Sequence, residues 1–339
     1  MKYFRFLWRA SFGLLYFIMV PTAGAQLSSP MLPGLYSNCD FCMCSEGISP
    51  LEMGGSSLRI DSRYTELSQE FSNGDRVSNP TNARETYFTN TLSFTQGIVS
   101  SLCATIIVPF ARKDESGIES GMQPITNIGI GDISILARYN IIADHRMGDT
   151  RIVSVTGGIK FANGSTSLIE QDAPSMSGQA ADPDMQLGTG TTDFFAGTGM
   201  LLGFDNWSIG ANLLAGIRGF GSGAAGHVYG NNLNYDLTGR YRLYEPEVNV
   251  PGMIQPTIFG AFGIRGEWRG YELQDGQPLD NDSLGWSGGN VLYLTPGVQL
   301  FFTPRLSLDL AVWLPVVHAL HGEQLGETVK VLGGLQLGL

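Results

Sequence analysis

The sequence predicts an all-β protein, a transmembrane antiparallel up-and-down β-barrel of about 12 strands. Two patterns support this fold class. First, apolar and polar residues alternate along segments that run from about Ser57 to Leu339. Second, the connections between these segments alternate between short and long. Outer-membrane barrels have both features, because every second residue of a strand faces lipid, and because tight turns and longer loops gather at opposite ends.

The first 25 residues have the composition of a signal peptide. The basic residues Lys2, Arg5 and Arg9 precede a short apolar run, and an Ala-Gly-Ala cleavage site follows at 23–25. Export followed by cleavage at this site is therefore expected. The chain is expected to have three parts: a signal peptide at 1–25, a periplasmic or lumenal segment with cysteines at 26–56, and the barrel at 57–339.

The composition fits a barrel and argues against two other classes of protein. A hydrophobic fraction of 43% is low for a helical membrane protein, and no segment after the signal peptide reaches the ~20 apolar residues of a spanning helix. The net charge of −11 argues against nucleic acid as a partner, since phosphate binding needs clustered Lys and Arg. The expected location is the outer membrane of a Gram-negative bacterium. The expected partners are membrane lipid, a small-molecule solute and the barrel assembly machinery.

The alternation is clearest within 132–141, where one face of the predicted strand is apolar and the other is polar. Strands are expected at 57–70, 85–96, 99–110, 129–142, 151–162, 190–203, 206–218, 229–243, 255–268, 289–302, 306–316 and 327–339. The long polar loops then fall at 71–84, 111–128, 163–189, 219–228, 269–288 and 317–326. These loops all lie on one side of the membrane, which predicts that they face outward and that both termini are periplasmic.

Two glycine-rich motifs resemble a known family. The stretch Gly129-Ile130-Gly131-Asp132-Ile133-Ser134-Ile135-Leu136-Ala137-Arg138-Tyr139 resembles a strand of the MetA-pathway of phenol degradation family of outer-membrane transporters. The stretch Gly188-Thr189-Gly190-Thr191-Thr192-Asp193 resembles the start of a second glycine-rich strand of that family. The resemblance implies a barrel that transports small, often hydrophobic, compounds.

Three of the four cysteines form one motif, Cys39-Asp40-Phe41-Cys42-Met43-Cys44. Three thiolates at Cys39, Cys42 and Cys44 are suited to Zn or Cu(I), and iron is a further candidate. The alternative is a disulfide, because the periplasm is oxidising and Cys103 lies on a predicted strand. The motif has no following histidine, which argues against covalent haem attachment.

A second candidate metal site lies in the last predicted loop, where His318 and His321 are followed by Glu323. Two imidazoles and a carboxylate can bind a divalent cation. The alternative is that all three are ordinary solvated loop residues, since spacing on a loop fixes little geometry.

Charged residues occupy the predicted inner face of the barrel. Rings of such side chains select which ions or solutes pass, or they pair with one another and fill a narrow interior; both interpretations remain open from the sequence. The candidate lumen-lining residues are Arg59, Arg63, Asp132, Arg138, Lys160, Asp236, Arg240, Arg242, Arg265 and Asp309.

No catalytic motif is present, and the chain contains only four histidines. The sequence therefore predicts a channel or transporter that passes small solutes through a polar lumen, and no enzyme. One alternative is an outer-membrane protein that handles Cu, Zn or Fe through the cysteine motif. A second alternative is an external-loop hydrolase or an adhesion barrel.

Overall fold

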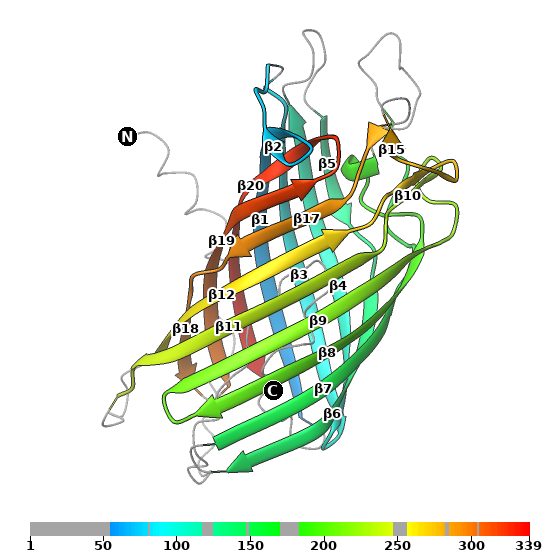
Figure 1. Ribbon diagram of the computed structural model, residues 1–339. Helices are drawn as coiled ribbons and strands as arrows, with labels where there is room; N and C mark the ends of the chain where they lie inside the picture. The colour runs from blue at the N-terminus through cyan, green and yellow to red at the C-terminus, as the bar shows by residue number, and fades with distance from the viewer. Residues whose placement is uncertain are drawn as a thin grey trace. The chain divides into compact units, whose positions relative to one another are not determined.

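The alternating segments form antiparallel strands that follow one another around a closed wall (Figure 1). The computed structural model describes residues 55–80, 82–116, 125–146, 149–169, 183–246, 256–281, 285–303 and 305–339. Within these residues the wall is a closed barrel of 12 strands, as the sequence predicts. Each strand pairs with its neighbours in sequence, and the first strand closes the wall by pairing with the last.

Two of the twelve strands are interrupted by a short break, so each carries two labels. The wall comprises β1 (Ser56–Ser72), β3 (Arg84–Val99), β4 (Leu102–Ser116), β5 (Ile125–Ile130) continued by β6 (Ser134–Arg146), β7 (Asp149–Lys160), β8 (Thr192–Phe204), β9 (Trp207–Phe220), β11 (Asn232–Tyr244), β12 (Thr257–Arg269), β17 (Gly289–Leu294) continued by β18 (Gly297–Thr303), β19 (Leu306–Leu320) and β20 (Glu323–Gly338). The connections add β2 (Asp75–Arg76), the single turn of 3₁₀ helix η1 (Pro183–Met185), β10 (His227–Val228), β13 (Leu273–Gln274), β14 (Gln277–Pro278), β15 (Asp280–Asn281) and β16 (Gly285–Trp286).

The barrel has two unlike ends. Ser57 of β1 pairs with Gly338 of β20, so the barrel wall begins and ends at the same end. We call this the turn end, because the reversals at 100–101 and 205–206 also lie there. The opposite end, the loop end, carries the longer connections, among them 221–231 and the described parts of 161–191 and 270–288 (Figure 1).

Three predicted connections are wrong. The loop expected at 111–128 is too long, because β4 continues to Ser116 and β5 begins at Ile125. The first reversal was expected at 97–98, but β3 continues to Val99 and the chain turns at 100–101. The last long loop was expected at 317–326, but β19 and β20 run through it and leave a turn only at 321–322. The reason is pairing: β1 extends to Ser72 and offers β20 hydrogen-bond partners as far as Glu323. The two histidines of the second candidate metal site therefore lie at a hairpin and not in a long loop.

The outer surface of the barrel is apolar. Phe94, Ile106 and Ile135 lie side by side on β3, β4 and β6, and Ile106 is 46% exposed. Their neighbours in sequence, such as Thr95 and Thr105, point inward and are buried. Soluble proteins rarely expose so continuous an apolar surface, so this surface is one for lipid. The described residues contain no helix that is long and apolar enough to cross a membrane.

Replacing Ile106 by arginine should destabilise the protein in a bilayer by about 2–4 kcal/mol relative to Ile106→Ala, because a charge would face hydrocarbon. Unfolding in phosphatidylcholine vesicles measures this difference. On a surface that faces water the same two variants would differ by less than about 0.5 kcal/mol. A difference that small would contradict the lipid-facing assignment.

Candidate functional site

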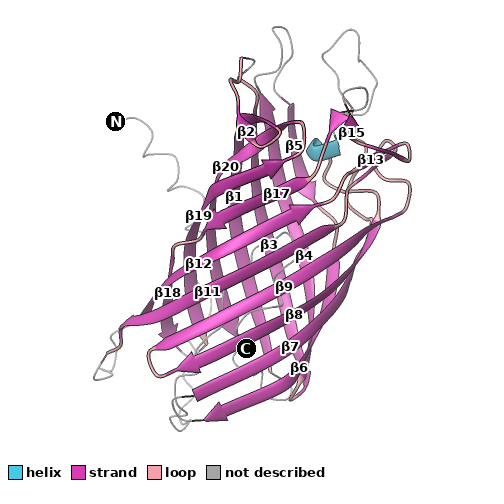
Figure 2. Cartoon of the chain, viewed as in Figure 1, coloured by secondary structure: helices cyan, strands magenta, loops and turns pink. Residues whose placement is uncertain are grey.

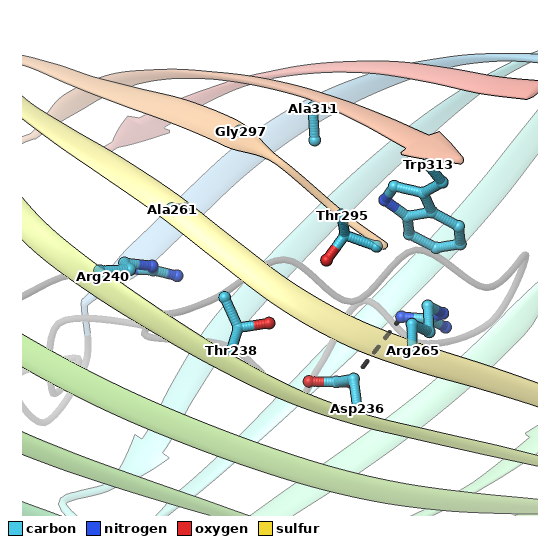
Figure 3. Close-up of a pocket in the computed structure, with 9 residues that line it drawn as sticks. All are labelled: Asp236, Thr238, Arg240, Ala261, Arg265, Thr295, Gly297, Ala311 and Trp313. Carbon is cyan, nitrogen blue, oxygen red and sulfur yellow. Dashed lines mark ion pairs between the residues drawn. The ribbon is translucent and has the colours of Figure 1, made fainter. Parts of the chain in front are cut away.

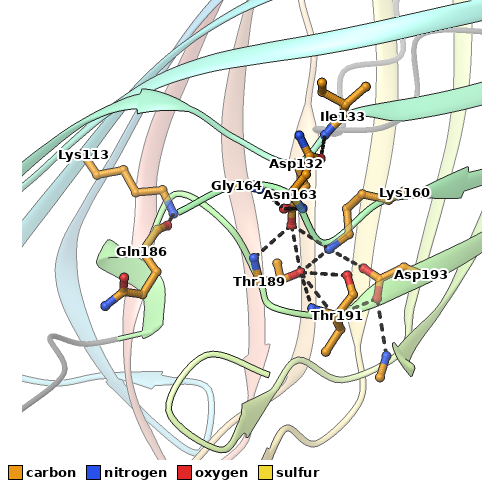
Figure 4. Close-up of polar contacts among 11 residues, drawn as sticks. Lys113, Asp132, Ile133, Lys160, Asn163, Gly164, Gln186, Thr189, Thr191 and Asp193 are labelled. Carbon is orange, nitrogen blue, oxygen red and sulfur yellow. Dashed lines mark hydrogen bonds and ion pairs between the residues drawn. The ribbon is translucent and has the colours of Figure 1, made fainter. Parts of the chain in front are cut away.

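The two glycine-rich motifs meet on the inner face of the barrel at the loop end, where Asp132 contacts Thr189, 57 residues further along the chain (Figure 4). The first motif breaks its strand between β5 and β6, and Asp132 lies in this break. One oxygen of Asp132, Oδ1, accepts the backbone N–H groups of Asn163 at 3.1 Å and Gly164 at 2.8 Å. The other, Oδ2, accepts the backbone N–H and the hydroxyl of Thr189, both at 2.9 Å. Asp132 therefore fixes both stems of the connection 161–191.

A buried lysine joins this carboxylate to a second one. Lys160 is the last residue of β7, and its side chain is fully buried. Its Nζ lies 2.6 Å from Oδ2 of Asp193 and 3.2 Å from Oδ2 of Asp132, and it also bonds the hydroxyl of Thr189. Thr191 donates to Oδ1 of Asp193 at 2.9 Å. We call Asp132, Lys160, Thr189, Thr191 and Asp193 the loop latch.

Beyond the latch, the described residues 183–187 of the connection 161–191 lie against the inner face of the wall. Lys113 on β4 donates to the carbonyl oxygens of Asp184 and Gln186, both at 2.7 Å. Asn127 on β5 donates to the carbonyl oxygen of Met185 at 2.8 Å. Met185 and Gln186 are almost completely buried. The turn η1 therefore occupies part of the interior at the loop end (Figure 2).

Glycine at position 188 is required by the close approach of the two stems. A Cβ atom there would lie 2.3 Å from the carbonyl oxygen of Gly164, which is closer than any real contact. Gly190 has a φ of +71°, a conformation that favours glycine. The second glycine-rich motif thus gives the chain the shape that lets Thr189 reach Asp132.

The connections at the loop end also bind one another. The backbone N–H of Ala224 donates to the carbonyl of Thr189 at 3.1 Å, and the Tyr229 hydroxyl donates to Asp184 at 3.0 Å. The connection 221–231 in turn pairs with 270–288 through β10 and β13. We call 161–191, 221–231 and 270–288 together the loop cap.

One contact within the loop cap is an ion pair that depends on pH. Nε2 of His227 lies 3.1 Å from Glu272. Burial alone would lower the pKa of His227, but the close carboxylate of Glu272 outweighs burial and raises the pKa above its ordinary value of 6.5. The negative charge of Asp184 acts in the same direction. The loop cap thus gains stability from protonated His227.

Because the folded pKa of His227 is raised, its contribution to stability is fully present below about pH 6.5 and is lost as pH rises through the folded pKa. We expect His227→Gln to cost about 1 kcal/mol more at about pH 5.5 than at about pH 9. The free energies of unfolding of the wild type and His227→Gln, measured at both pH values, give this difference. Contributions from other titrating groups are the same in both proteins and cancel. Equal costs at both pH values would show that the pair does not titrate.

Part of the inner face is apolar, which the sequence reasoning did not predict. Ile107, Leu136 and Phe195 form a buried cluster, and Leu214 packs against it. These residues occupy inward positions of β4, β6, β8 and β9. The predicted polar lumen is therefore polar only in part.

A second polar network lies on β12, β17 and β20. Nζ of Lys330 is 2.9 Å from Glu267 and 2.8 Å from Glu327, and Tyr293 donates its hydroxyl to Glu327. Arg269 lies 3.5 Å from Glu327. Glu327 was not predicted as an inner residue, because a register shift between β1 and β20 at this point interrupts the strict alternation; Lys330 fits the alternation but was not among the predicted lumen-lining residues.

A small pocket opens into the interior beside this network (Figure 3); its free volume of about 20 Å³ has room for about one water molecule. Arg265 lies 3.8 Å from Asp236 and 3.6 Å from Glu267, and its guanidinium is 4.3 Å from the centre of the Trp313 ring. Arg240 donates to the side-chain oxygen of Gln299 at 3.0 Å. The pocket is lined by Asp236, Thr238, Arg240, Ala261, Arg265, Thr295, Gly297, Ala311 and Trp313.

The predicted lumen-lining residues fall into several places. Asp132 and Lys160 belong to the loop latch, and Asp236, Arg240 and Arg265 line the pocket. The others lie as follows: Arg59 bonds Asp309 at 2.9 Å, Arg138 is buried on β6, Arg63 is half-buried on β1, and Arg242 at the turn end pairs with Glu245. Their roles in solute passage stay predictions.

The predicted metal-binding histidines have other contacts in the structure: the ring of His318 is hydrogen-bonded through Nε2 to the carbonyl oxygen of Glu327 at 2.8 Å. His318 stacks on Phe71 with ring centres 4.1 Å apart, and His321 lies against Tyr271. Within the described ranges no group of three or more His, Cys, Asp or Glu residues is placed to hold a metal ion. The site at His318 and His321 therefore stays a prediction. Cys39, Cys42 and Cys44, like the signal peptide, lie outside the described residues, and Cys103 is buried on β4.

Comparison with solved structures places the fold in a class. The chain is similar to an outer membrane channel from Pseudomonas putida F1, with a TM-score of 0.63 and 16% identity over 86% of this chain and 99% of that chain. The NanC porin gives a TM-score of 0.40 at 10% identity over 83% and 100% of the two chains. A FadL homologue of Pseudomonas aeruginosa gives 0.35 at 10% over 85% and 91%.

No family model matches the chain, and no curated protein matches it in sequence. At 16% identity the likeness to the Pseudomonas putida channel concerns the fold. Together with the apolar outer surface, it defines this chain as a transmembrane β-barrel of the outer-membrane class.

Proposed function

We propose that this protein is an outer-membrane channel that passes small solutes through the interior of its barrel. The observation that carries the proposal is the contrast between the two surfaces of the wall: lipid-facing residues such as Ile106 outside, and charged residues such as Arg240 and Asp132 inside. Charged side chains are costly within a membrane, so they occur there mainly where they line a path for solutes or pair with one another. The similarity of the fold to that of the Pseudomonas putida outer membrane channel supports the same function.

The interior is narrow, which limits the solutes to small ones. Many inward side chains, including Lys160, Arg265 and Trp313, are at most 1% exposed, and the described turn η1 with Gln186, in the connection 161–191, occupies part of the loop end. We infer that this connection sets the size of the passage, and that the loop latch holds it in place. The apolar cluster around Phe195 would contact the uncharged parts of a solute along part of its route through the barrel.

Several further properties follow from this function. The loop end would face the outside and both termini the periplasm, as is usual for barrels with long loops at one end. The barrel assembly machinery would insert the chain, and lipid and small solutes would be its partners, with no part for nucleic acid or catalysis. Membership of the MetA-pathway of phenol degradation family is supported by the role of both glycine-rich motifs in the loop latch.

Osmotic swelling of liposomes tests the proposal. Vesicles that contain the purified protein are diluted into solutions of uncharged solutes of increasing size, with protein-free vesicles as the control. We expect swelling with the smallest solutes and none with the largest. Swelling no faster than that of protein-free vesicles for every solute would contradict a channel.

Metal handling by Cys39, Cys42 and Cys44 is a separate prediction that the described residues do not reach. Metal analysis of the purified chain beside Cys42→Ser checks it. Zn, Cu or Fe that is retained by the wild type and lost in the variant would support it, and a metal-free wild type after incubation with each ion would contradict it.

A further inference from the structure

We propose that the connection 221–231 is a lid at the loop end of the passage, which His227 holds closed when its imidazole is protonated and lets open when it is neutral. The inference rests on the proposed function, because it adds a pH-dependent gate to the same channel. Three observations support it: the position of one buried imidazole, the contacts of 221–231 with its neighbours, and a glycine-rich stretch at its start.

His227 lies where 221–231 meets two other connections of the loop cap. Its side chain is buried, and its Nε2 is 3.1 Å from Glu272 in the connection 270–288. The ring lies edge-on to that of Tyr229, with centres 4.9 Å apart, and Tyr229 donates its hydroxyl to Asp184 of η1 at 3.0 Å. When the imidazole is charged, it is therefore attracted to carboxylates of both neighbouring connections.

The other ionisable groups around the lid are of both signs. The carboxylate of Asp275 lies against Gly226, next to His227 in sequence, and the guanidinium of Arg218 on β9 is 5.7 Å from the centre of the Tyr229 ring. On the other side of 270–288, Tyr271 packs against the imidazole of His321. Burial disfavours the charged imidazole of His227, yet the balance of its surroundings raises its pKa. The closed lid therefore favours the protonated form.

The start of the lid has the composition of a hinge. The stretch that joins β9 to β10 has glycine at 219, 221, 223 and 226. Gly221 and Gly223 have φ of +154° and +70°, a region that glycine enters without strain. Hinges absorb large changes of backbone dihedral angles over a few such residues. Rotation here would move 221–231 away from η1 and leave the pairing of β9 with β11 unchanged.

The remaining contacts of the lid do not depend on pH in the neutral range. The backbone N–H of Ala224 donates to the carbonyl oxygen of Thr189 at 3.1 Å, and that of Asp275 donates to the carbonyl oxygen of Gly226 at 2.9 Å. These bonds favour the closed lid at every pH, and the charge on His227 adds to them. Because the pKa of His227 is raised in the closed lid, this addition is fully present below about pH 6.5 and is lost as pH rises through the raised pKa.

Recordings of the full-length protein in planar bilayers at about pH 5.5 and about pH 9 test the inference. We expect the open probability of the wild type to be about three- to tenfold higher at the higher pH. His227→Lys keeps a cation at both pH values and should give the low value at both, whereas His227→Gln carries no charge and should give the high value at both. His145→Gln changes a histidine at the turn end and should keep the wild-type response.

A reversible crosslink tests the lid without changing His227. Val228 and Leu273 are paired across β10 and β13, so cysteines at both positions can form a disulfide in a protein whose native cysteines are serine. The oxidised protein should keep the low open probability at about pH 9, and reduction should restore the wild-type response. Equal open probability of the wild type at the two pH values would overturn the inference. So would a wild-type response in both His227→Lys and His227→Gln, or in the oxidised crosslink.

Hydrogen exchange of the backbone amides of 221–231 separates this inference from the proposed function, because it follows the lid without any current. After correction for the intrinsic effect of pH on exchange, protection should fall about three- to tenfold from about pH 5.5 to about pH 9 in the wild type and not in His227→Lys. Swelling with small solutes and a lid that ignores pH would leave the channel and remove the gate. A lid that responds through His227, without swelling by any solute, would leave the switch and remove the channel.

Discussion

Lys160→Met should lower the free energy of unfolding by about 3–5 kcal/mol, because it leaves two buried carboxylates without their shared cation. Lys160 lies 2.6 Å from Asp193 and 3.2 Å from Asp132, and all three side chains are buried. Methionine has a similar length and no charge, so the loss is electrostatic and leaves little cavity. Urea unfolding of the protein in vesicles, followed by tryptophan fluorescence, measures the change.

The matched control for this change is Arg151→Met, which removes a cation from an exposed pair. Arg151 and Asp149 are 2.7 Å apart, but the arginine side chain is 59% exposed. Exposed pairs contribute at most about 1 kcal/mol. A loss in Lys160→Met as small as that in Arg151→Met would show that the loop latch does not stabilise the barrel.

Asp132→Ala should raise the single-channel conductance several-fold, because it releases both stems of the connection 161–191 at once. The carboxylate accepts hydrogen bonds from Asn163, Gly164 and Thr189 and is paired with Lys160. A hydrogen bond to a charged group contributes about 1.5–3 kcal/mol, so alanine removes the main attachment of this connection. Recordings in planar bilayers compare the variant with the wild type.

Thr189→Val tests the same attachment with a smaller change. It removes the hydroxyl bond to Asp132 and keeps the backbone bond, so a smaller rise in conductance is expected. Asp149→Ala, which removes an exposed carboxylate of β7, should leave conductance unchanged. Wild-type conductance in a folded Asp132→Ala barrel would mean that the connection does not narrow the passage.

The strands could be predicted because the membrane imposes a simple rule on them. Lipid outside and a polar interior force a period of two, which places Ile135 outward and Arg138 inward without any tertiary information. The same rule identified Asp132 and Lys160 as inward residues. It failed where the wall itself is irregular, as at the register shift beside Glu327 and at the hairpin of His321.

The loop latch could not be predicted as a unit, because loops carry no periodic signal. Thr189 meets Asp132 only through the path of 161–191, which depends on close glycine contacts such as Gly164 with Gly188. The two glycine-rich motifs drew attention to these residues in the sequence. They did not indicate that the motifs contact one another in the fold. The sequence did not single out Leu136 as an apolar inward residue, because the inward positions next to it on the same strand are polar.

Thiol blocking at an inward and an outward position tests most directly whether solutes pass through the barrel. In a protein whose native cysteines are serine, Ser93→Cys places a thiol on the inner face of β3, where Ser93 is buried. Leu92→Cys places one on the lipid-facing surface next to it, where Leu92 is 45% exposed. Each variant is recorded in a planar bilayer before and after a charged methanethiosulfonate reagent is added.

We expect discrete current steps in both variants, with steps that shrink after the reagent only for Ser93→Cys. The absence of current in both variants, or an equal response to the reagent at the two positions, would contradict passage through the interior of the barrel.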